Sequence, residues 1–229
     1  MHHAIKPAPL GDVSDAEELL LNNEIGYNAL HTHLIDLRSR AATIVHRMDR
    51  SYWLGRIEMI LGMQESLSRR RAAAVAHFVA ARHYALDTLE QQEFSDAWRL
   101  LSDAIAQLLI SRGPMFQFMY GMRARDAALR ALDLDFSNIR AHIATAGWYL
   151  NAPSFAGGDV SYAVDILEQA GSSDTITRVE QFLVCGLLSY AYYENADSEY
   201  SAEFYTRALH LYPRSAWLKN IGESIELVP

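Results

Sequence analysis

Apolar residues recur along most of the chain at steps of three to five positions, the spacing that puts them on one face of an α-helix. The stretch from 14 to 48, which includes Leu30 and Leu34, is typical. Strand-type alternation is absent, and no proline stands between Pro9 and Pro114. We therefore predict an all-α protein with helices at about 14–48, 51–67, 70–91, 94–111, 115–135, 137–151, 159–171, 175–194, 197–212 and 214–227.

The breaks between these helices coincide with residues that end or begin helices. A glycine–proline pair at 113–114 ends one helix, and the segment 153–158 ends another. Asp159 is expected to be an N-cap whose carboxylate accepts hydrogen bonds from the N–H groups of the next turn. Ser137, with Asn138, is expected to cap the helix at 137–151.

The C-terminal part of the chain follows the tetratricopeptide pattern, a repeat of ~34 residues with W-x2-L-G-x2-Y on its first helix and A-x3-F…P on its second. The first-helix positions fall on Cys185, Leu188, Ser189 and Tyr192. The second-helix positions fall on Ser201, Tyr205, Ala208 and Pro213. Small residues in this pattern let two helix backbones approach, and Pro213 stops the second helix because it lacks an N–H group.

Two earlier segments follow the same scheme less closely. In the first, the matching positions are Ile143, Ala146, Gly147 and Leu150, then Ala163, Leu167 and Ala170. A long loop at 152–159 separates its two helices. In the second, Ala124, Ala128 and Ala131 match a second helix, and its first helix is expected at about 94–111.

Residues 94–213 thus resemble the tetratricopeptide repeat (TPR) family. The resemblance implies antiparallel helix pairs stacked as a right-handed solenoid that binds a partner instead of catalysing a reaction. Helices within 14–93 would pack on this solenoid, and 214–229 would form a C-terminal capping helix. Residues 1–13 are expected to be disordered.

A second resemblance rests on the loop Asn151-Ala-Pro-Ser-Phe-Ala-Gly-Gly-Asp159 and on the Leu-Glu-Gln-Ala that ends the next helix. This loop is similar to one in the TPR-like T-component associated with tripartite ATP-independent periplasmic (TRAP) transporters. That resemblance implies a periplasmic protein that binds a small ligand, or the transporter's substrate-binding partner, in a helical pore. Members of that group carry a lipid anchor, whereas no lipid-accepting cysteine stands in this N-terminus.

Composition narrows the range of partners. Half of the 229 residues are apolar, and the formal net charge is −8 with both signs interleaved. This balance argues against nucleic acid as the main partner, because neutralising phosphates needs a basic surface. The run Arg69-Arg70-Arg71 is interpreted as a solvated junction between two helices. The single cysteine, Cys185, lies in an apolar stretch typical of a small core residue.

The sequence has no stretch near the ~18 apolar residues of a membrane span. It also begins without a charged-then-apolar signal segment. We therefore expect a cytoplasmic protein, or a periplasmic one if the chain is a mature fragment whose signal segment has been removed. The sequence pattern is compatible with an oligomer as well as with a monomer.

No catalytic constellation or cofactor motif is recognisable, so we predict that the protein is not an enzyme. His77 and His83 are six positions apart on one predicted helix, which is unsuitable for two metal ligands on one face. The remaining alternative, ranked well behind, is a weak metal site that uses His31, His33 and His46. Cys185 has no neighbouring base that could activate it.

The predicted binding surface is the face of the two best-fitting first helices that points away from the packing positions. Its members are Trp148, Asn151, Leu183, Tyr190, Tyr193 and Glu194. Large amphipathic rings suit such a surface, because they bury much area at low entropic cost. Burial of Trp148 in the core remains an equal alternative, and at least one tyrosine of the 190–193 cluster must be core. A second apolar cluster, either core or a subunit interface, comprises Met115, Phe116, Phe118, Met119, Tyr120 and Met122.

Overall fold

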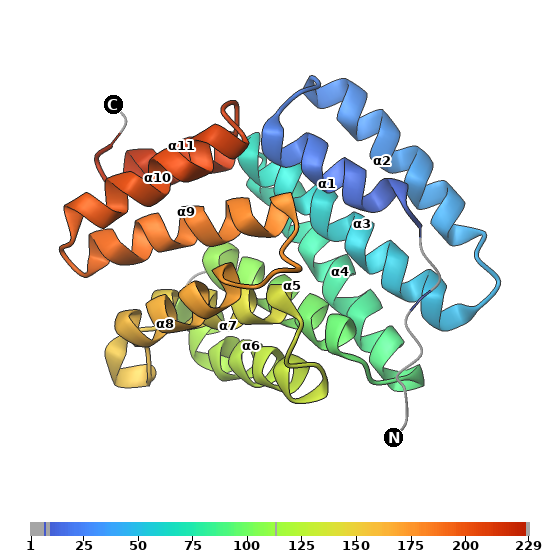
Figure 1. Cartoon of the computed structure of the whole chain (residues 1–229). Helices are drawn as coiled ribbons and strands as arrows, with labels where there is room; N and C mark the ends of the chain where they lie inside the picture. Colours follow the sequence, from blue (N-terminus) through green and yellow to red (C-terminus); the bar gives the residue numbers. More distant parts are fainter. Residues whose placement is uncertain (1–6, 8–9, 113, 228–229) are drawn as a thin grey trace. The chain divides into compact units, whose positions relative to one another are not determined.

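The computed structural model describes residue 7, residues 10–112 and residues 114–227. Within this part of the chain the secondary structure is helical, as predicted, and no strand occurs (Figure 1). The helices are α1 (Asp12–Asn22), α2 (Tyr27–Ala42), α3 (Arg47–Leu67), α4 (Arg71–Gln91), α5 (Ser95–Arg112), α6 (Pro114–Leu134), α7 (Ile139–Asn151), the 3-10 turn η1 (Ser154–Ala156), α8 (Val160–Gly171), α9 (Arg178–Glu194), α10 (Ser198–Leu211) and α11 (Ala216–Ser224).

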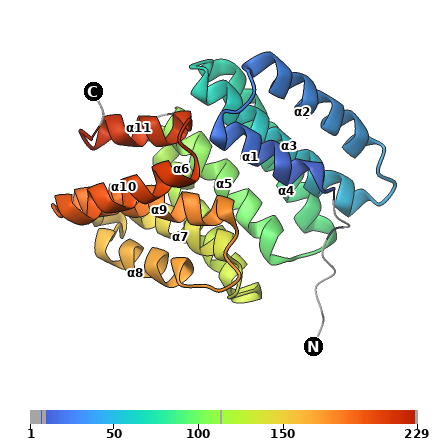
Figure 2. The ribbon, with the colours of Figure 1, turned by 45° about the horizontal axis from the view of Figure 1, so that its top comes forward.

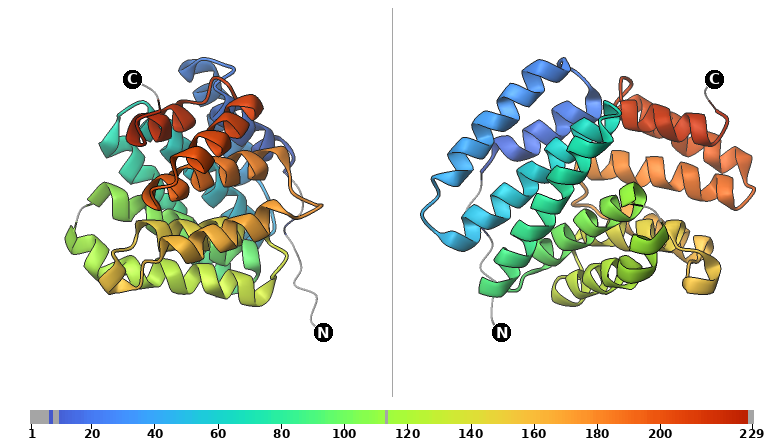
Figure 3. Two further views of the ribbon diagram at one scale, coloured as in Figure 1. Left: turned by 60° about the vertical axis from the view of Figure 1, so that its left-hand side comes forward. Right: turned by 180° about the vertical axis from the view of Figure 1, so that it is seen from behind.

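The helices form two compact units. The N-terminal unit comprises the described residues up to Leu20 and those of 24–138, and the C-terminal unit comprises 21–23 and 139–227. From α2 to α6 in the N-terminal unit, and from α7 to α11 in the C-terminal unit, helices that follow one another along the chain pack side by side. Figures 1 and 2 show this for α3 with α4, and Figure 3 shows it for α9 with α10. The segment predicted to form repeats, 94–213, contributes helices to both units.

The prediction of a single helix at 14–48 is wrong in one respect, because the structure has three helical segments there, separated by two breaks. The first break follows Asn22, where Asn23 adopts a positive φ of 52° and Gly26 is the extended N-cap of α2. Asparagine is one of the few non-glycine residues that tolerate the left-handed region, so a helix can stop there. The second break follows Ala42. The apolar period itself is confirmed, because Leu30 and Leu34 are both buried.

The core of the N-terminal unit is built around α3. This helix is buried along most of its length and packs against α2 and α4. At Gly62 the neighbouring helix comes very close, because a Cβ placed there would lie 2.4 Å from the ring of the fully buried Phe78. A larger residue at this position would therefore force the two helices apart. After α3 the chain turns through Arg69 and Arg70, at the helix junction that the basic run predicted.

The core of the C-terminal unit contains the small residues that the repeat pattern singled out. Ser189 on α9 and Ser201 on α10 are both buried, and each hydroxyl donates to the carbonyl oxygen of the other residue, at 2.9 and 2.8 Å. Ala146 on α7 and Ala163 on α8 are fully buried as well. Close packing of helix backbones at these small residues agrees with the prediction.

The helix ends agree with most of the sequence signals. The Asp159 carboxylate caps α8 by accepting from the backbone N–H of Tyr162 at 3.0 Å. Gly157 just before it has a φ of +97°, which favours glycine. α10 ends at Leu211, two positions before Pro213. Ser137 behaves differently from the prediction, since its hydroxyl donates to Asp135 at 2.6 Å and α7 begins only at Ile139.

Two other expectations concern the chain ends and the membrane. The predicted disordered segment 1–13 falls largely on residues 1–6, 8 and 9, which lie outside the described residues, and α1 begins at Asp12. None of the helices in the described part is both long enough and apolar enough to cross a membrane.

Candidate functional site

The six residues of the predicted binding surface lie on two helices of the C-terminal unit. Trp148 and Asn151 are on α7, and the other four are on α9. Asn151 and Glu194 are exposed, whereas Leu183, Tyr190 and Tyr193 are half-buried. Trp148 is only 9% exposed. The half-buried rings therefore remain the part of this surface best placed to meet a ligand.

Trp148 supports the long loop that follows α7. Its ring packs edge-on against Tyr149, with ring centroids 5.1 Å apart. It also lies next to the loop, because a Cβ placed on Gly157 would be 3.7 Å from the indole. The side chain of Asn151 is hydrogen-bonded within its own helix, since its amide donates to the carbonyl oxygen of Gly147 at 2.7 Å. Of the two alternatives for Trp148, the burial supports a packing role.

The three tyrosines of the 190–193 cluster separate as expected, with one of them in the helix seam. Tyr192 donates to Glu168 on α8 at 2.5 Å and stacks on Phe204 of α10. Burial, the hydrogen bond to Glu168 and its charge all raise the pKa of Tyr192. Tyr192 is therefore a packing residue that ties α9 to its two neighbours, and Tyr190 and Tyr193 point elsewhere.

Tyr190 combines an apolar ring with a charged neighbour. Burial raises the pKa of Tyr190, and the carboxylate of Glu194, one helical turn further on, adds to this by its charge and by accepting a hydrogen bond. The phenol therefore stays neutral in the physiological range. The pair presents an aromatic face beside one negative charge, which can contact an apolar or cationic side chain of a partner.

Cys185, on the same helix, has an unreactive thiol. The thiol is buried in α9, and burial raises its pKa. Since the thiolate is the nucleophile, a raised pKa makes the group unreactive near neutral pH. The structure thus agrees with the interpretation of Cys185 as a core residue.

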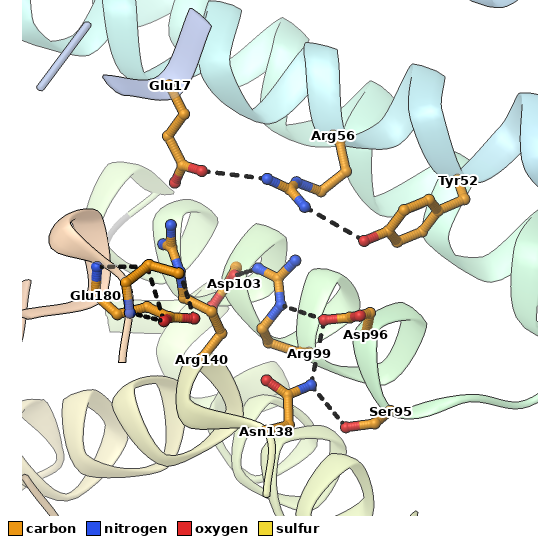
Figure 4. Close-up of polar contacts among 11 residues, drawn as sticks. Glu17, Tyr52, Arg56, Ser95, Asp96, Arg99, Asp103, Asn138, Arg140 and Glu180 are labelled. Carbon is orange, nitrogen blue, oxygen red and sulfur yellow. Dashed lines mark hydrogen bonds and ion pairs between the residues drawn. The ribbon is translucent and has the colours of Figure 1, made fainter. Parts of the chain in front are cut away.

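The N-terminal unit contains a cluster of buried charged residues that the sequence analysis did not predict (Figure 4). Arg99 on α5 is almost fully buried, with Nη1 at 2.5 Å from Asp103 and Nε at 3.5 Å from Asp96. Arg56 on α3 lies 3.1 Å from Glu17 of α1 and donates to the hydroxyl of Tyr52 at 3.3 Å.

We interpret the cluster as a structural network, because neighbouring carboxylates compensate the positive charges of its arginines. The pKa of Arg99 is raised because the attraction of Asp103 and Asp96 outweighs the opposing effect of burial. Asn138 extends the network by donating to Ser95 at 2.8 Å and to Asp96 at 3.2 Å. Ser95 in turn donates to the carbonyl oxygen of Ala131, which ties α5 to α6.

A separate ion pair in the C-terminal unit joins α7 to α9. Arg140 Nε lies 3.7 Å from Glu180 (Figure 4). Glu180 also accepts from the backbone N–H of Thr177, whose hydroxyl accepts from the backbone of Glu180. This reciprocal capping box fixes the start of α9, the helix that carries the tyrosines.

The histidines of the alternative metal site have other neighbours. His31 stacks on Tyr27 and lies 3.3 Å from Gln64, while His46 lies 3.3 Å from Asp49. Among the described residues, no three His, Cys, Asp or Glu side chains come together as a metal site would require. His77 instead lies 2.6 Å from Glu58, a buried carboxylate that also pairs with Arg38.

Of the second apolar cluster, four side chains are described. Phe116 stacks on Tyr120 with ring centroids 4.4 Å apart, and Met119 and Met122 are exposed. The side chains of Met115 and Phe118 lie outside the described part of the structure.

Comparison with known proteins leaves the geometry as the basis for assigning a function. No family model matches the sequence, and no curated protein matches it either.

Proposed function

We propose that the protein is a non-enzymatic, TPR-like binding or scaffold protein that holds a segment of a partner protein on α7 and α9 of its C-terminal unit. The observation that carries the proposal is the pair of half-buried rings, Tyr190 and Tyr193, left on α9 after Tyr192 is taken up by packing. Aromatic residues with a polar tip contribute strongly to protein–protein interfaces.

The packing of the C-terminal unit supports a repeat arrangement. α7 packs on α8 and α9 packs on α10, while α7 also contacts α9 and α8 contacts α9. A second pair of helices thus stacks on the first, and its first helix lies against the first helix of the preceding pair. TPR-like proteins use the free face of these first helices as the binding groove, which here would be the face that carries Tyr190.

The charge of the surface suggests which segment it would hold. Glu194 stands beside Tyr190, and the protein as a whole has a net charge of −8. A partner segment with an apolar anchor and a Lys or Arg next to it would place the anchor on the rings and the cation on the carboxylate. Cation–π contact with a tyrosine would add to the same complementarity.

Affinity capture from an extract of the source organism tests this proposal. The bait is the wild-type protein, compared with Tyr190→Ala/Tyr193→Ala and with Tyr162→Ala, which removes an exposed tyrosine from α8. We expect a partner that wild type and Tyr162→Ala retain and that the double variant loses. Trp148 is left intact because it is buried, and truncating it would open a cavity. A partner retained equally by all three proteins would contradict the assignment of the surface.

A second candidate is a transporter-associated protein similar to the TRAP T-component. It is favoured by the loop after α7, which is held by hydrogen bonds from Gly158 N to Pro153 O and from Asp159 N to Tyr149 O, both at 3.1 Å. The tip of this loop presents Phe155, which is 92% exposed. Genes for a transporter and a substrate-binding protein beside the gene, and capture of that protein by wild type but not by Phe155→Ala, would favour this candidate.

A further inference from the structure

The N-terminal unit contains a pocket of about 390 Å³ between α4, α5 and α6. Apolar side chains form much of its wall, namely Leu86 on α4, Leu101 and Ile105 on α5, and Ala127 on α6. This volume falls in the range of about 300–1,000 Å³ typical of small-molecule sites, which are apolar with a few polar groups. All of its lining residues belong to the N-terminal unit, whereas the proposed partner-binding surface belongs to the C-terminal unit.

Three arginines from two of these helices line the same pocket. They are Arg82 on α4 and Arg123 and Arg130 on α6. Arg130 is neutralised, because it donates to Glu93 at 2.8 Å. The one acidic lining residue, Asp126, is likewise engaged, since Arg125 donates to it at 3.0 and 3.2 Å.

The other two arginines lack such compensation. Arg82 and Arg123 form no ion pair with a carboxylate anywhere in the described part of the chain. Each guanidinium lies beside the ring of Tyr120 instead, at 5.5 and 5.0 Å from its centroid. One ring thus orients two positive charges at the same pocket, in a protein whose net charge is negative.

Two donors at this pocket are also unsatisfied. Arg82 Nε and Trp98 Nε1 are buried and have no hydrogen-bond acceptor among the described residues. Trp98 lines the pocket from α5. Burying an N–H group without an acceptor is unfavourable, and native structures rarely leave one so. An acceptor that arrives in the pocket, with at most a rotation of either side chain, would provide the missing partner.

We propose that this pocket binds a small organic carboxylate with an aromatic or aliphatic body. The carboxylate would pair with Arg82, with Arg123 supplying a second positive charge and Trp98 a neutral donor. Its apolar body would lie against Leu86, Leu101 and Ile105. A guanidinium matches the planar, acceptor-only carboxylate in geometry as well as in charge.

Two features favour a small monoanion over other anions. Among the described lining residues, only Arg82 and Arg123 are positively charged without a carboxylate partner, which is too few to neutralise a polyanion such as a nucleotide. The unsatisfied donors are buried, so the acceptor has to enter the pocket, which a small molecule does more readily than a side chain fixed to a protein surface.

Isothermal titration calorimetry of the full chain with pairs of matched ligands tests the proposal. The probes are benzoate, 4-phenylbutyrate, indole-3-acetate and octanoate, each compared with its neutral primary amide. We expect at least one carboxylate to bind saturably at one site, with the amide weaker by about tenfold or more, as expected for losing a charge-assisted hydrogen bond. Inorganic phosphate and an acidic decapeptide are included as alternative anions.

Matched variants locate the site. Arg82→Gln/Arg123→Gln should weaken the carboxylate by about tenfold or more. The control Arg69→Gln/Arg112→Gln removes the same charge from exposed positions that do not line the pocket, and it should bind as wild type does. Thermal melting without ligand checks that both variants fold. Trp98→Phe should abolish any fluorescence change that the carboxylate produces.

Several results would overturn the proposal. The first is that the carboxylates bind no better than their amides. The second is that binding survives in Arg82→Gln/Arg123→Gln, and the third is that the two double variants lose affinity equally. Binding of phosphate or of the peptide in preference to every small carboxylate would likewise reject it, in favour of a different anion.

Discussion

Trp217 of α11 packs directly against Gly186 of α9. A Cβ placed on Gly186 would lie 2.6 Å from the indole ring, so the two helices meet here only because this residue has no side chain. The same indole stacks edge-on against Phe182, one turn earlier on α9, with centroids 5.3 Å apart. The last helix of the chain is thus docked on the helix that carries the proposed binding surface.

This contact makes Gly186 sensitive to enlargement. We expect Gly186→Leu to displace Trp217 and to lower the free energy of unfolding by about 1–3 kcal/mol, the usual cost of overpacking. Urea denaturation measures the loss. Gly121→Leu on α6 is the control, because a Cβ there meets no atom within 4 Å. Equal losses in the two variants would mean that α11 is not docked in this way.

The reciprocal serine contact between α9 and α10 leads to a second prediction. Ser189→Ala removes one hydroxyl from a buried pair and should cost about 1 kcal/mol of unfolding free energy. Ser189→Leu keeps no hydroxyl and adds volume to a seam without space, so it should cost several times more. Chemical denaturation compares both with Thr206→Ala, whose hydroxyl bonds only within its own helix. A leucine variant as stable as the alanine variant would contradict close packing at this seam.

The cap of α8 is a third test. Asp159→Ala removes the acceptor of the Tyr162 N–H group and should destabilise the C-terminal unit by about 0.5–2 kcal/mol. Asp159→Asn should restore most of this, because an amide oxygen also caps. Asp165→Ala, an exposed change on the same helix, should have little effect in the same thermal and urea melts. Failure of the asparagine variant to restore stability would mean that charge, and not the hydrogen bond, matters here.

Asp87 on α4 makes stability depend on pH. Its burial tends to raise the pKa of the carboxyl, but hydrogen bonds from Ser51 and Arg47 outweigh this and hold the pKa below the ordinary value of 3.8. The folded state therefore binds this proton less readily than the unfolded state does. The stabilisation is present above about pH 4 and is lost as the pH falls through the lowered pKa.

Urea titrations at neutral pH and near pH 3 check this dependence. Asp87→Asn should be less stable than wild type at neutral pH, and the difference should shrink on acidification. Asp133→Asn, an exposed change on α6, should track the wild type at both pH values. A difference for Asp87→Asn that does not change with pH would rule out the linkage.

Features that depend on neighbouring positions were predictable from the sequence. The helical period placed Leu30 and Leu34 on a buried face, and the repeat pattern identified Ser189 and Ser201 as positions where helices approach closely. The break at Asn23 was missed because a single asparagine is compatible with both a helix and a left-handed turn. The local pattern of side chains does not decide between them.

The pocket illustrates what the sequence signal could not resolve. Arg123, Ala127 and Arg130 recur at helical spacing on one face of α6, a hint that basic residues share a direction. Arg82 and Trp98, however, reach the same cavity from two other helices. Nothing in their local sequence indicates that they meet.

The sequence by itself therefore determined the all-α class, most helix ends and the close seam between α9 and α10, because periodicity, caps and small residues act over a few positions of the chain. Only the tertiary structure decided that Trp148 is buried, that Tyr192 contacts Glu168 of α8 and Phe204 of α10, and that Arg82 and Arg123 face a cavity without a carboxylate partner among the described residues. These outcomes depend on which helices lie side by side and at what rotation, and that choice is set by the packing of the whole unit.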